Sequence, residues 1–484
     1  MASHKKMMQT SIKKNYIYNT IYQVLSLITP LITAPYISRV LGSSGVGIYS
    51  YTNSIVTYFT LFAALGTASY GQREIAMHRD DPETSSKLFW EIEILSLTTT
   101  AVSLIVWIAW IFISTQYTAI YSVLTLSVLA VAFDISWYFG GFEKFKYIVI
   151  RNTLVKITGI ILLFLFVKKE TDIFLYVGIM AATGLIGNIS MWTYLPKLLT
   201  KVEFKTLHPF KIHLKQTFAY FIPTVATSVY TVLDKTMIGA ITKSEELNGY
   251  YEQATKIIRM IESLLFSLNT VMVSRQSYLF AEGRTEEIKD KINKSFEFIF
   301  ALAVPIMFGI WGAARNFVPW FFGNGYEPVV TLLYLMSPLP LVICISNIMG
   351  SQYLTPSGQR ARSSKGIIAG AVTNFLLNLA LIYKYGANGA TLASVVAECV
   401  ISAIYVHMSK GFINWKKILN VLWKKLIAGF VMFWAVLFIG GNYQGSINIS
   451  ACQVIFGMAL YGIMLIVLKD NVIYDALKII RRRK

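Results

Sequence analysis

The feature that most constrains this chain is a succession of apolar segments, each about twenty residues long, separated by short polar connections. A hydrocarbon core about 30 Å thick is crossed by an α-helix of about that length. With 55% hydrophobic and 14% charged residues, the 484-residue chain falls among multi-span membrane proteins. We therefore predict an all-α integral membrane protein. It has about fourteen transmembrane helices, at residues 15–40, 47–66, 87–114, 118–141, 150–167, 172–195, 215–240, 247–274, 295–314, 328–353, 366–385, 388–407, 423–440 and 447–468.

The basic residues lie mostly on one side of this predicted topology. The chain has 44 Lys and Arg against 25 Asp and Glu, and most of these cations fall in cytoplasmic segments when even-numbered helices return inward. Both termini are therefore predicted to be cytoplasmic. The basic tail, residues 478–484, is then a topological anchor or lipid contact, not a nucleic-acid site. The cysteines and histidines show no metal or redox spacing, so we predict no metal site and no cofactor.

One predicted helix, Leu247–Ser274, carries Glu252, Lys256, Arg259 and Glu262. At about 100° per residue, the first three charges fall within an arc of roughly 60°, so the helix has one charged stripe. Each mid-membrane charge that faces lipid costs about 2.5 to 3.5 kcal/mol, which favours a polar interior around the stripe. Two roles stay open: the cations contact an anionic substrate, or the four charges form an ion-pair network that only locks helices.

The chain also contains a weak internal repeat. An offset of 202 residues superposes three positions on three others: Gly47, Tyr49 and Arg73 on Gly249, Tyr251 and Arg275. Helices one to six then pair with helices seven to twelve in the same orientation, as in transporters with two lobes around a central site. The predicted division is an N-terminal lobe (1–198), a cytoplasmic interfacial linker (199–214), a C-terminal lobe (215–408), and two further helices with the basic cytoplasmic tail (409–484).

Several stretches together carry a family resemblance: SRVLGSSGVGIYSY (38–51), GQREIA (71–76), WYFGGFEKFKYIVIRN (137–152), LDKTMIG (233–239), FFGNGYEP (321–328), TPSGQ (355–359) and YGANGATLASVVAE (385–398). The chain resembles the bacterial polysaccharide repeat-unit flippases, within the superfamily that also contains multidrug and lipid-linked peptidoglycan-precursor exporters. This resemblance implies a fourteen-helix, two-lobe fold with a central cavity. It also implies the cargo, an undecaprenyl-pyrophosphate-linked oligosaccharide carried from the inner to the outer leaflet.

Cationic cavity residues are a further implication of the resemblance, and Arg39, Lys256 and Arg259 are the best-matching positions. A pyrophosphate carries at least two negative charges, which Arg meets with a fixed fork of donors and Lys with a mobile point charge. Lys235 is a second candidate at the outer end of its helix, either as a gate or cavity residue or as an interfacial charge. Lys156 either meets the substrate from the cytoplasmic side or extends to lipid headgroups.

The acidic residues within predicted helices are candidates for ion coupling or charge balance. Asp134 and Glu398 are either coupling-ion carboxylates or neutralised helix contacts. Glu252 and Glu262 balance the cations on their own helix, and Glu262 is also a candidate to bind a proton or sodium ion. Asp234 is next to Lys235 in the helix predicted at 215–240, and the same two interpretations apply to it: a gate or cavity residue, or an interfacial charge.

We therefore expect a flippase, not an enzyme, in the bacterial plasma membrane, working by alternating access in capsule, exopolysaccharide or O-antigen assembly. Its expected partners are the lipid-linked oligosaccharide and membrane lipids, with polysaccharide polymerase and chain-length proteins as candidate protein partners and no nucleic acid. One rival is a multidrug or organic-cation antiporter, which a cationic stripe disfavours because it repels cations. The other is a membrane polymerase or glycosyltransferase, which would need a large loop with clustered acids or arginines; only Asp80 and Asp81 come near that.

Overall fold

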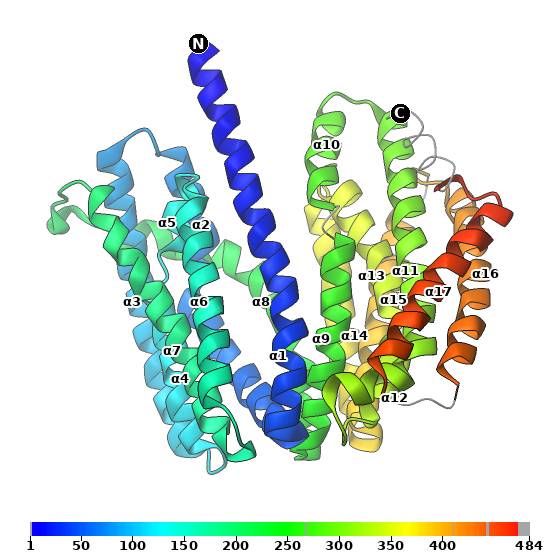
Figure 1. The fold of residues 1–484 in the computed structure, drawn as a ribbon. Coiled ribbons are helices and arrows are strands. Elements are labelled where there is room, and N and C mark those ends of the chain that lie inside the picture. Colours follow the sequence, from blue (N-terminus) through cyan, green and yellow to red (C-terminus); the bar gives the residue numbers. More distant parts are fainter. Residues whose placement is uncertain (1, 267–268, 410, 442–444, 473–484) are drawn as a thin grey trace. The chain divides into compact units, whose positions relative to one another are not determined.

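The computed structural model describes residues 2–266, 269–409, 411–441 and 445–472. These residues form α-helices with a few short 3-10 and π segments, and they contain no β-strand, which confirms the predicted all-α class. The chain divides into two compact units, Met1–Thr236 and Met237–Lys484. We call them the N-terminal unit and the C-terminal unit and describe each by itself (Figure 1).

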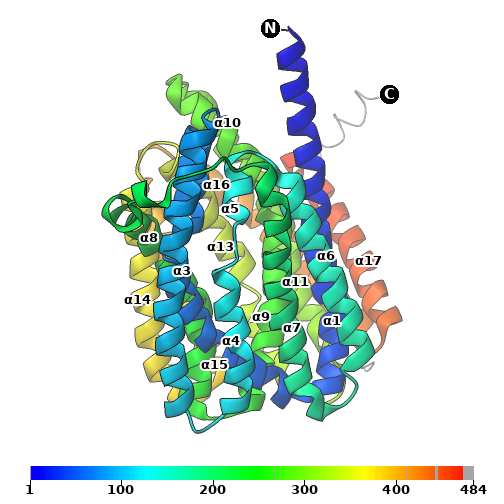
Figure 2. The same ribbon diagram turned by 90° about the vertical axis from the view of Figure 1, so that its left-hand side faces the viewer.

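The N-terminal unit is built from eight helices, the last of which continues a few residues beyond it: α1 (Ala2–Ala64), α2 (Thr67–Met77), α3 (Pro82–Ile113), α4 (Thr118–Val131), α5 (Ser136–Gly141), α6 (Phe145–Phe166), α7 (Ile173–Met191) and α8 (Pro209–Thr242). Its 3-10 turns are Glu170–Asp172, Trp192–Lys197 and Phe204–Thr206. Within this unit α4 packs between α3 and α7, and α7 also packs on α6 (Figure 2).

The C-terminal unit contains nine further helices: α9 (Glu245–Phe266), α10 (Asn269–Ala281), α11 (Thr285–Phe322), α12 (Pro328–Met336), α13 (Leu339–Ile348), α14 (Arg360–Tyr385), α15 (Ala387–Met408), α16 (Trp415–Gly440) and α17 (Ile447–Val467). A π segment, Met349–Leu354, extends α13. The predicted charged helix is therefore α9 and the start of α10. The predicted basic tail lies outside the described residues.

Eleven segments of the described chain are long and apolar enough to cross a membrane, so the predicted count of fourteen is not confirmed. The first segment, Tyr22–Met77, covers the predicted helix at 47–66 and most of the one at 15–40, because α1 is continuous across them apart from one break. The predicted helices at 215–240 and 247–274 are not among the eleven. In α9 the reason is composition, since it carries six acidic and basic residues in 22.

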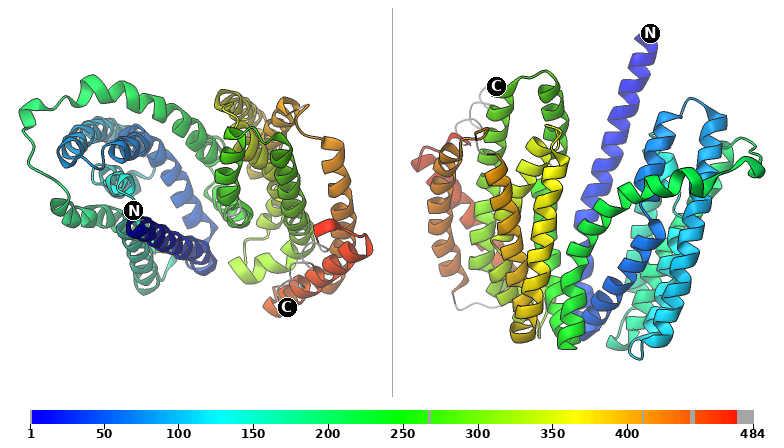
Figure 3. Two further views of the ribbon diagram at one scale, coloured as in Figure 1. Left: turned by 90° about the horizontal axis from the view of Figure 1, so that it is seen from above. Right: turned by 180° about the vertical axis from the view of Figure 1, so that it is seen from behind.

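Two glycines shape the first two predicted membrane crossings. Gly42 has φ 67° and ψ −179°, a left-handed φ that interrupts the helical geometry of α1. Gly66 has φ 76° and separates α1 from α2. A Cβ atom on Gly66 would lie 2.8 Å from the backbone N of Phe221 and 2.8 Å from the carbonyl O of Thr217, so α8 passes directly against it (Figure 3). A side chain at Gly66 would therefore both strain the backbone and displace α8.

Two of the family-like stretches pack on each other in the N-terminal unit. A Cβ atom on Gly71 of α2 would lie 2.4 Å from the Trp137 ring of α5, and one on Gly141 would lie 2.6 Å from Ile75. Each glycine thus makes room for a buried side chain of the other stretch. The motifs GQREIA and WYFGG therefore belong to one packing unit, although sixty residues of sequence lie between them.

Helix α3 begins with a well-formed cap. The Asp81 carboxylate accepts hydrogen bonds from the backbone N of Glu83 at 3.1 Å and of Thr84 at 3.2 Å, and Pro82 occupies the first helical position. The Thr84 hydroxyl also donates to Asp81 at 2.5 Å, and these hydrogen bonds hold the pKa of that carboxyl below its ordinary value. The cap explains why the helix begins at the end of a short loop.

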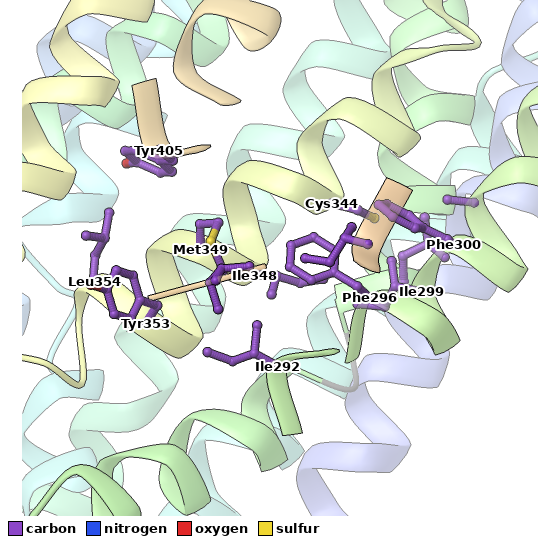
Figure 4. Close-up of a cluster of buried hydrophobic side chains, with 14 of the residues drawn as sticks. Ile292, Phe296, Ile299, Phe300, Cys344, Ile348, Met349, Tyr353, Leu354 and Tyr405 are labelled. Carbon is purple, nitrogen blue, oxygen red and sulfur yellow. The ribbon is translucent and has the colours of Figure 1, made fainter. Parts of the chain in front are cut away.

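The C-terminal unit has a buried apolar cluster between α11, α13 and the segment that follows α13. Phe296, Ile299 and Phe300 of α11 meet Cys344 and Ile348 of α13, and each of these side chains is at most 2% exposed (Figure 4). Close packing of this kind favours a fixed relative position of the two helices.

The last two helices are joined to the rest of the C-terminal unit by buried polar contacts. The Asn316 side-chain nitrogen of α11 donates to Ser450 Oγ of α17 at 2.7 Å, and Gln453 of α17 donates to the carbonyl O of Val436 in α16 at 2.9 Å. At the other end, Lys425 Nζ lies 2.8 Å from Asp470 Oδ2, and both side chains are buried. These contacts make α16 and α17 an integral part of the unit.

The compact units do not follow the repeat-based boundaries. The boundary between them falls after Thr236, inside α8, whereas the predicted linker is 199–214. Within that linker, residues from Pro209 onward already belong to α8. A packing boundary and a repeat boundary describe different properties of a chain, so the predicted lobes remain a prediction.

Candidate functional site

The charged stripe of α9 is partly paired within the helix. Lys256 Nζ lies 3.4 Å from Glu252 Oε1, one turn away, and the exposed fractions of the two side chains are 28% and 10%. Arg259 is exposed. Much of α9 is buried, and the helix packs against α12, α13 and α15. Lys256 is therefore drawn to an acid of its own helix, and Arg259 is the more exposed of the two predicted cations.

The structure brings Glu262 of α9 and Glu398 of α15 together. The two carboxyl groups act on each other electrostatically, and Arg259 acts on Glu262 with the opposite sign. Glu398 is 7% exposed, and Cys344 of α13 lies within electrostatic range of Glu262. Two acids that lie 136 positions apart in the sequence thus occupy one region of the C-terminal unit, beside one of the predicted substrate cations.

Lys156, a candidate substrate contact, is engaged with α1 in the N-terminal unit. Its Nζ donates to Ser26 Oγ at 2.5 Å and lies 4.6 Å from the centre of the Tyr22 ring. A hydrogen bond and a cation–π contact together hold α6 against the first half of α1. These contacts give Lys156 a structural role. A contact between Lys156 and the substrate remains a prediction.

The other predicted residues of the N-terminal unit lie on α1 and α8. Arg39 is exposed on α1, three residues before the Gly42 break. Asp234 is buried and Lys235 is half-buried on α8. Asp234 acts electrostatically on Tyr58 of α1. The predicted contacts of Arg39 and Lys235 with substrate remain a prediction.

Asp134 lies in a break between α4 and α5, inside the apolar segment Thr118–Gly141. Its Oδ1 accepts a hydrogen bond from the backbone N of Ser136 at 3.0 Å. Two side chains, one from α7 and one from the 3-10 turn that follows it, donate hydrogen bonds to backbone carbonyl groups at this break. Asn188 Nδ2 donates to the carbonyl O of Ala130 at 2.7 Å, and Trp192 Nε1 donates to that of Phe133 at 3.0 Å.

The predicted site does not include a buried polar network that the structure reveals at the start of α8. His213 Nε2 lies 2.7 Å from Glu91 Oε2 of α3, and His213 Nδ1 lies 2.7 Å from the Tyr70 hydroxyl of α2. The backbone N of His208 donates to the other oxygen of Glu91 at 2.9 Å. This network fastens the predicted linker to α3. Only the presence of two acids in one apolar helix signals it in the sequence.

Comparisons with solved structures define the class of fold. The chain matches the lipid II flippase MurJ in an inward closed conformation with a TM-score of 0.72 and 16% identity, covering 95% of this chain and 99% of that one. It matches an inward-facing multidrug resistance transporter of the MATE family, in the MOP superfamily, with a TM-score of 0.61 and 12% identity, covering 85% and 98%. The fold is that of these multi-pass membrane transporters.

Sequence comparisons identify the family. Residues 12–274 match the model of the family described as polysaccharide biosynthesis protein, and this chain belongs to that family. It is 25% identical to a candidate O-antigen transporter of Escherichia coli K12, over 81% of this chain and 95% of the relative. Identity to the Haloferax volcanii low-salt glycan biosynthesis flippase Agl15 is 23%, over 54% and 56% of the two chains.

Proposed function

We propose that this protein is a flippase. It moves oligosaccharide repeat units, linked to undecaprenyl pyrophosphate, from the inner to the outer leaflet of a bacterial plasma membrane. The observation that carries this proposal is family membership, together with relatives named as O-antigen transporters over nearly their whole length. The archaeal relative is named as a flippase, and one structural neighbour is a lipid II flippase. All of these are transporters, which supports a transporter and not an enzyme.

The mechanism we propose is alternating access of two lobes, 1–198 and 215–408, with both termini in the cytoplasm. Such lobes rock around a central site and expose it first to one side of the membrane and then to the other. The polyprenyl tail stays in lipid while the charged headgroup crosses. Polysaccharide polymerase and chain-length proteins are the partners that would receive the cargo, in capsule, exopolysaccharide or O-antigen assembly.

Arg259 and Lys256 are the residues that we assign to the pyrophosphate. Arg259 supports this role because it is exposed on α9. Lys256 lies one turn away on the same stripe, with its Nζ 3.4 Å from Glu252 Oε1. A diphosphate would offer Lys256 a second, more highly charged acceptor, so binding would exchange one ion pair for another. We assign Arg39, Lys235 and Lys156 to other parts of the route that the charged headgroup takes through the protein.

The acids Asp234, Glu252 and Glu262 balance these cations, and Asp134 and Glu398 are candidate coupling residues. The closeness of Glu262 and Glu398 supports a coupling site in the C-terminal unit. Two acids that neighbour each other away from water favour binding of a proton or another cation.

A transport assay tests the function directly. Purified protein is reconstituted in vesicles that contain an undecaprenyl-pyrophosphate-linked oligosaccharide, and membrane-impermeant periodate then reports the fraction of sugar on each leaflet. We expect protein-dependent movement between leaflets that Lys256→Met and Arg259→Met slow. Depletion in cells should leave the lipid-linked intermediate on the inner leaflet.

The alternative function is export of organic cations, which the structural likeness to multidrug transporters favours. That function would appear as protein-dependent resistance to cationic drugs, with no effect of depletion on lipid-linked sugars. This pair of outcomes would overturn the proposed flippase.

A further inference from the structure

Glu93 of α3 is a buried carboxyl group without a partner. Its side chain is 1% exposed, and neither carboxyl oxygen has a hydrogen-bond partner in the described chain. It lies about 16 Å along α3 from Pro82, well inside an apolar segment. An ionised carboxylate buried in this way without a partner is strongly unfavourable, so Glu93 must be neutral or must lie beside a group that neutralises it.

The charged group that acts on Glu93 is Asp134, another acid. Asp134 occupies the break between α4 and α5, and one of its oxygens accepts the Ser136 backbone N–H. Its side chain is half-buried, whereas that of Glu93 is fully buried. In transporters, helices broken inside the membrane place ion-binding groups where water can reach them from one side.

Three basic residues on neighbouring elements contact other groups. Arg73 of α2 pairs with Glu74 at 3.2 Å near the surface, and Arg151 of α6 donates to Asn188. His213 of α8 contacts Glu91, which lies two residues before Glu93 on α3. Residues 43–64 of α1, 118–131 of α4 and 173–191 of α7 contain no acidic or basic residue. Within the described chain, no cation forms an ion pair with either carboxyl of the two acids.

We propose that Glu93 and Asp134 share one exchangeable proton. Glu93 is buried and the charge of Asp134 acts on it, so ionising both carboxyl groups at once is unfavourable and the pair keeps one proton until the pH is high. The proton rests on buried Glu93, and half-buried Asp134 is the route by which it reaches water. Release leaves both groups as carboxylates and delivers one proton to solvent. Because the site is defined by binding alone, it does not depend on the identity of the transported lipid.

Infrared difference spectroscopy on the full chain in lipid nanodiscs, without substrate, tests the proposal. We expect a carbonyl band from a protonated carboxyl group that shifts in heavy water and disappears as the pH rises from about 5 to about 9. Glu93→Gln should remove this band, and in Asp134→Asn the band should disappear at a lower pH than in the wild type. Glu83→Gln is the matched control, because Glu83 is exposed on the first turn of the same helix.

Three results would overturn the shared proton: no such band at any pH, a band that survives Glu93→Gln, or a band that does not respond to pH. A band that responds to sodium but not to choline at constant pH would assign the pair to an alkali ion and equally refute the proposal. Thermal unfolding of both variants checks that they are folded. Since no lipid-linked sugar is present, failure here leaves the proposed flippase function unaffected, and failure of the transport assay leaves this site unaffected.

Discussion

The pair Glu252–Lys256 separates the two roles that the charged stripe of α9 can play. In the first role Lys256 binds the pyrophosphate, and in the second it only locks α9 through its ion pair. Lys256→Met removes the cation, whereas Glu252→Gln removes the competing acid and keeps the cation. The two substitutions should therefore have opposite effects on substrate binding in the first case and similar effects in the second.

The magnitudes also differ between the two roles. One-turn ion pairs on exposed helices contribute about 0.3 to 0.5 kcal/mol, and this pair, with Lys256 28% exposed and Glu252 more buried, should contribute about 1 kcal/mol at most. A charge-assisted hydrogen bond to a phosphate contributes about 1.5 to 3 kcal/mol. We expect Lys256→Met to weaken substrate binding roughly ten- to hundred-fold, and Glu252→Gln to leave it unchanged or tighten it.

Affinity is measured with purified protein in detergent and an undecaprenyl-pyrophosphate-linked oligosaccharide, and stability by thermal unfolding of the same samples. Lys289→Met is the matched control, because Lys289 pairs with Glu286 at 2.8 Å on α11, outside the stripe. If Lys256→Met and Glu252→Gln both leave affinity within about twofold of the wild type and lower stability alike, Lys256 does not bind the pyrophosphate and the assignment is refuted.

Three further predictions concern the fold. Gly71→Ala should destabilise the protein by about 1 to 3 kcal/mol because its Cβ would lie 2.4 Å from a buried indole, whereas Gly184→Ala, with no atom within 4 Å, should be neutral or stabilising; equal melting temperatures would contradict this. Lys425→Met should cost about 3 to 5 kcal/mol by leaving the buried Asp470 charge unpaired, and Lys425→Met/Asp470→Leu should recover much of it; a double variant as unstable as the single one would contradict the ion-pair explanation. The folded-state pKa of Asp81 is lowered, so its stabilisation is present above its ordinary pKa near 3.8 and is lost as pH falls through the folded value. Asp81→Ala should therefore lower the melting temperature at neutral pH, with a difference that vanishes in acid; a difference independent of pH would contradict the capping role.

Much of the fold follows from local sequence patterns. Apolar runs of membrane length predict nearly every helix, because helical periodicity and hydropathy are properties of consecutive residues. The charged stripe of α9 is predicted for the same reason, since Glu252 and Lys256 are one turn apart. The number of membrane crossings does not follow from composition alone. The charged stripe makes α9 too polar to be counted as a membrane-spanning helix by its composition.

The grouping of the site residues could not be predicted. Glu262 and Glu398 are individually visible as acids in apolar segments, but nothing in their spacing indicates that α9 and α15 bring them together. Lys156 shows the reverse case, since its depth in a helix suggests a substrate contact while its nearest partners are on α1.

The sequence by itself determined the all-α membrane class, the apolar segments and the family, because each depends on residue type and on neighbours along the chain. Only the tertiary structure decided which buried acids have partners. Glu91 and Glu93 are two residues apart on α3, so they point to different sides of the helix. Glu91 meets His213, which lies 122 positions later, while the charged group that acts on Glu93 is Asp134, in the break between two other helices. Packing between distant segments sets these environments, so one acid is a structural contact and the other a candidate proton site.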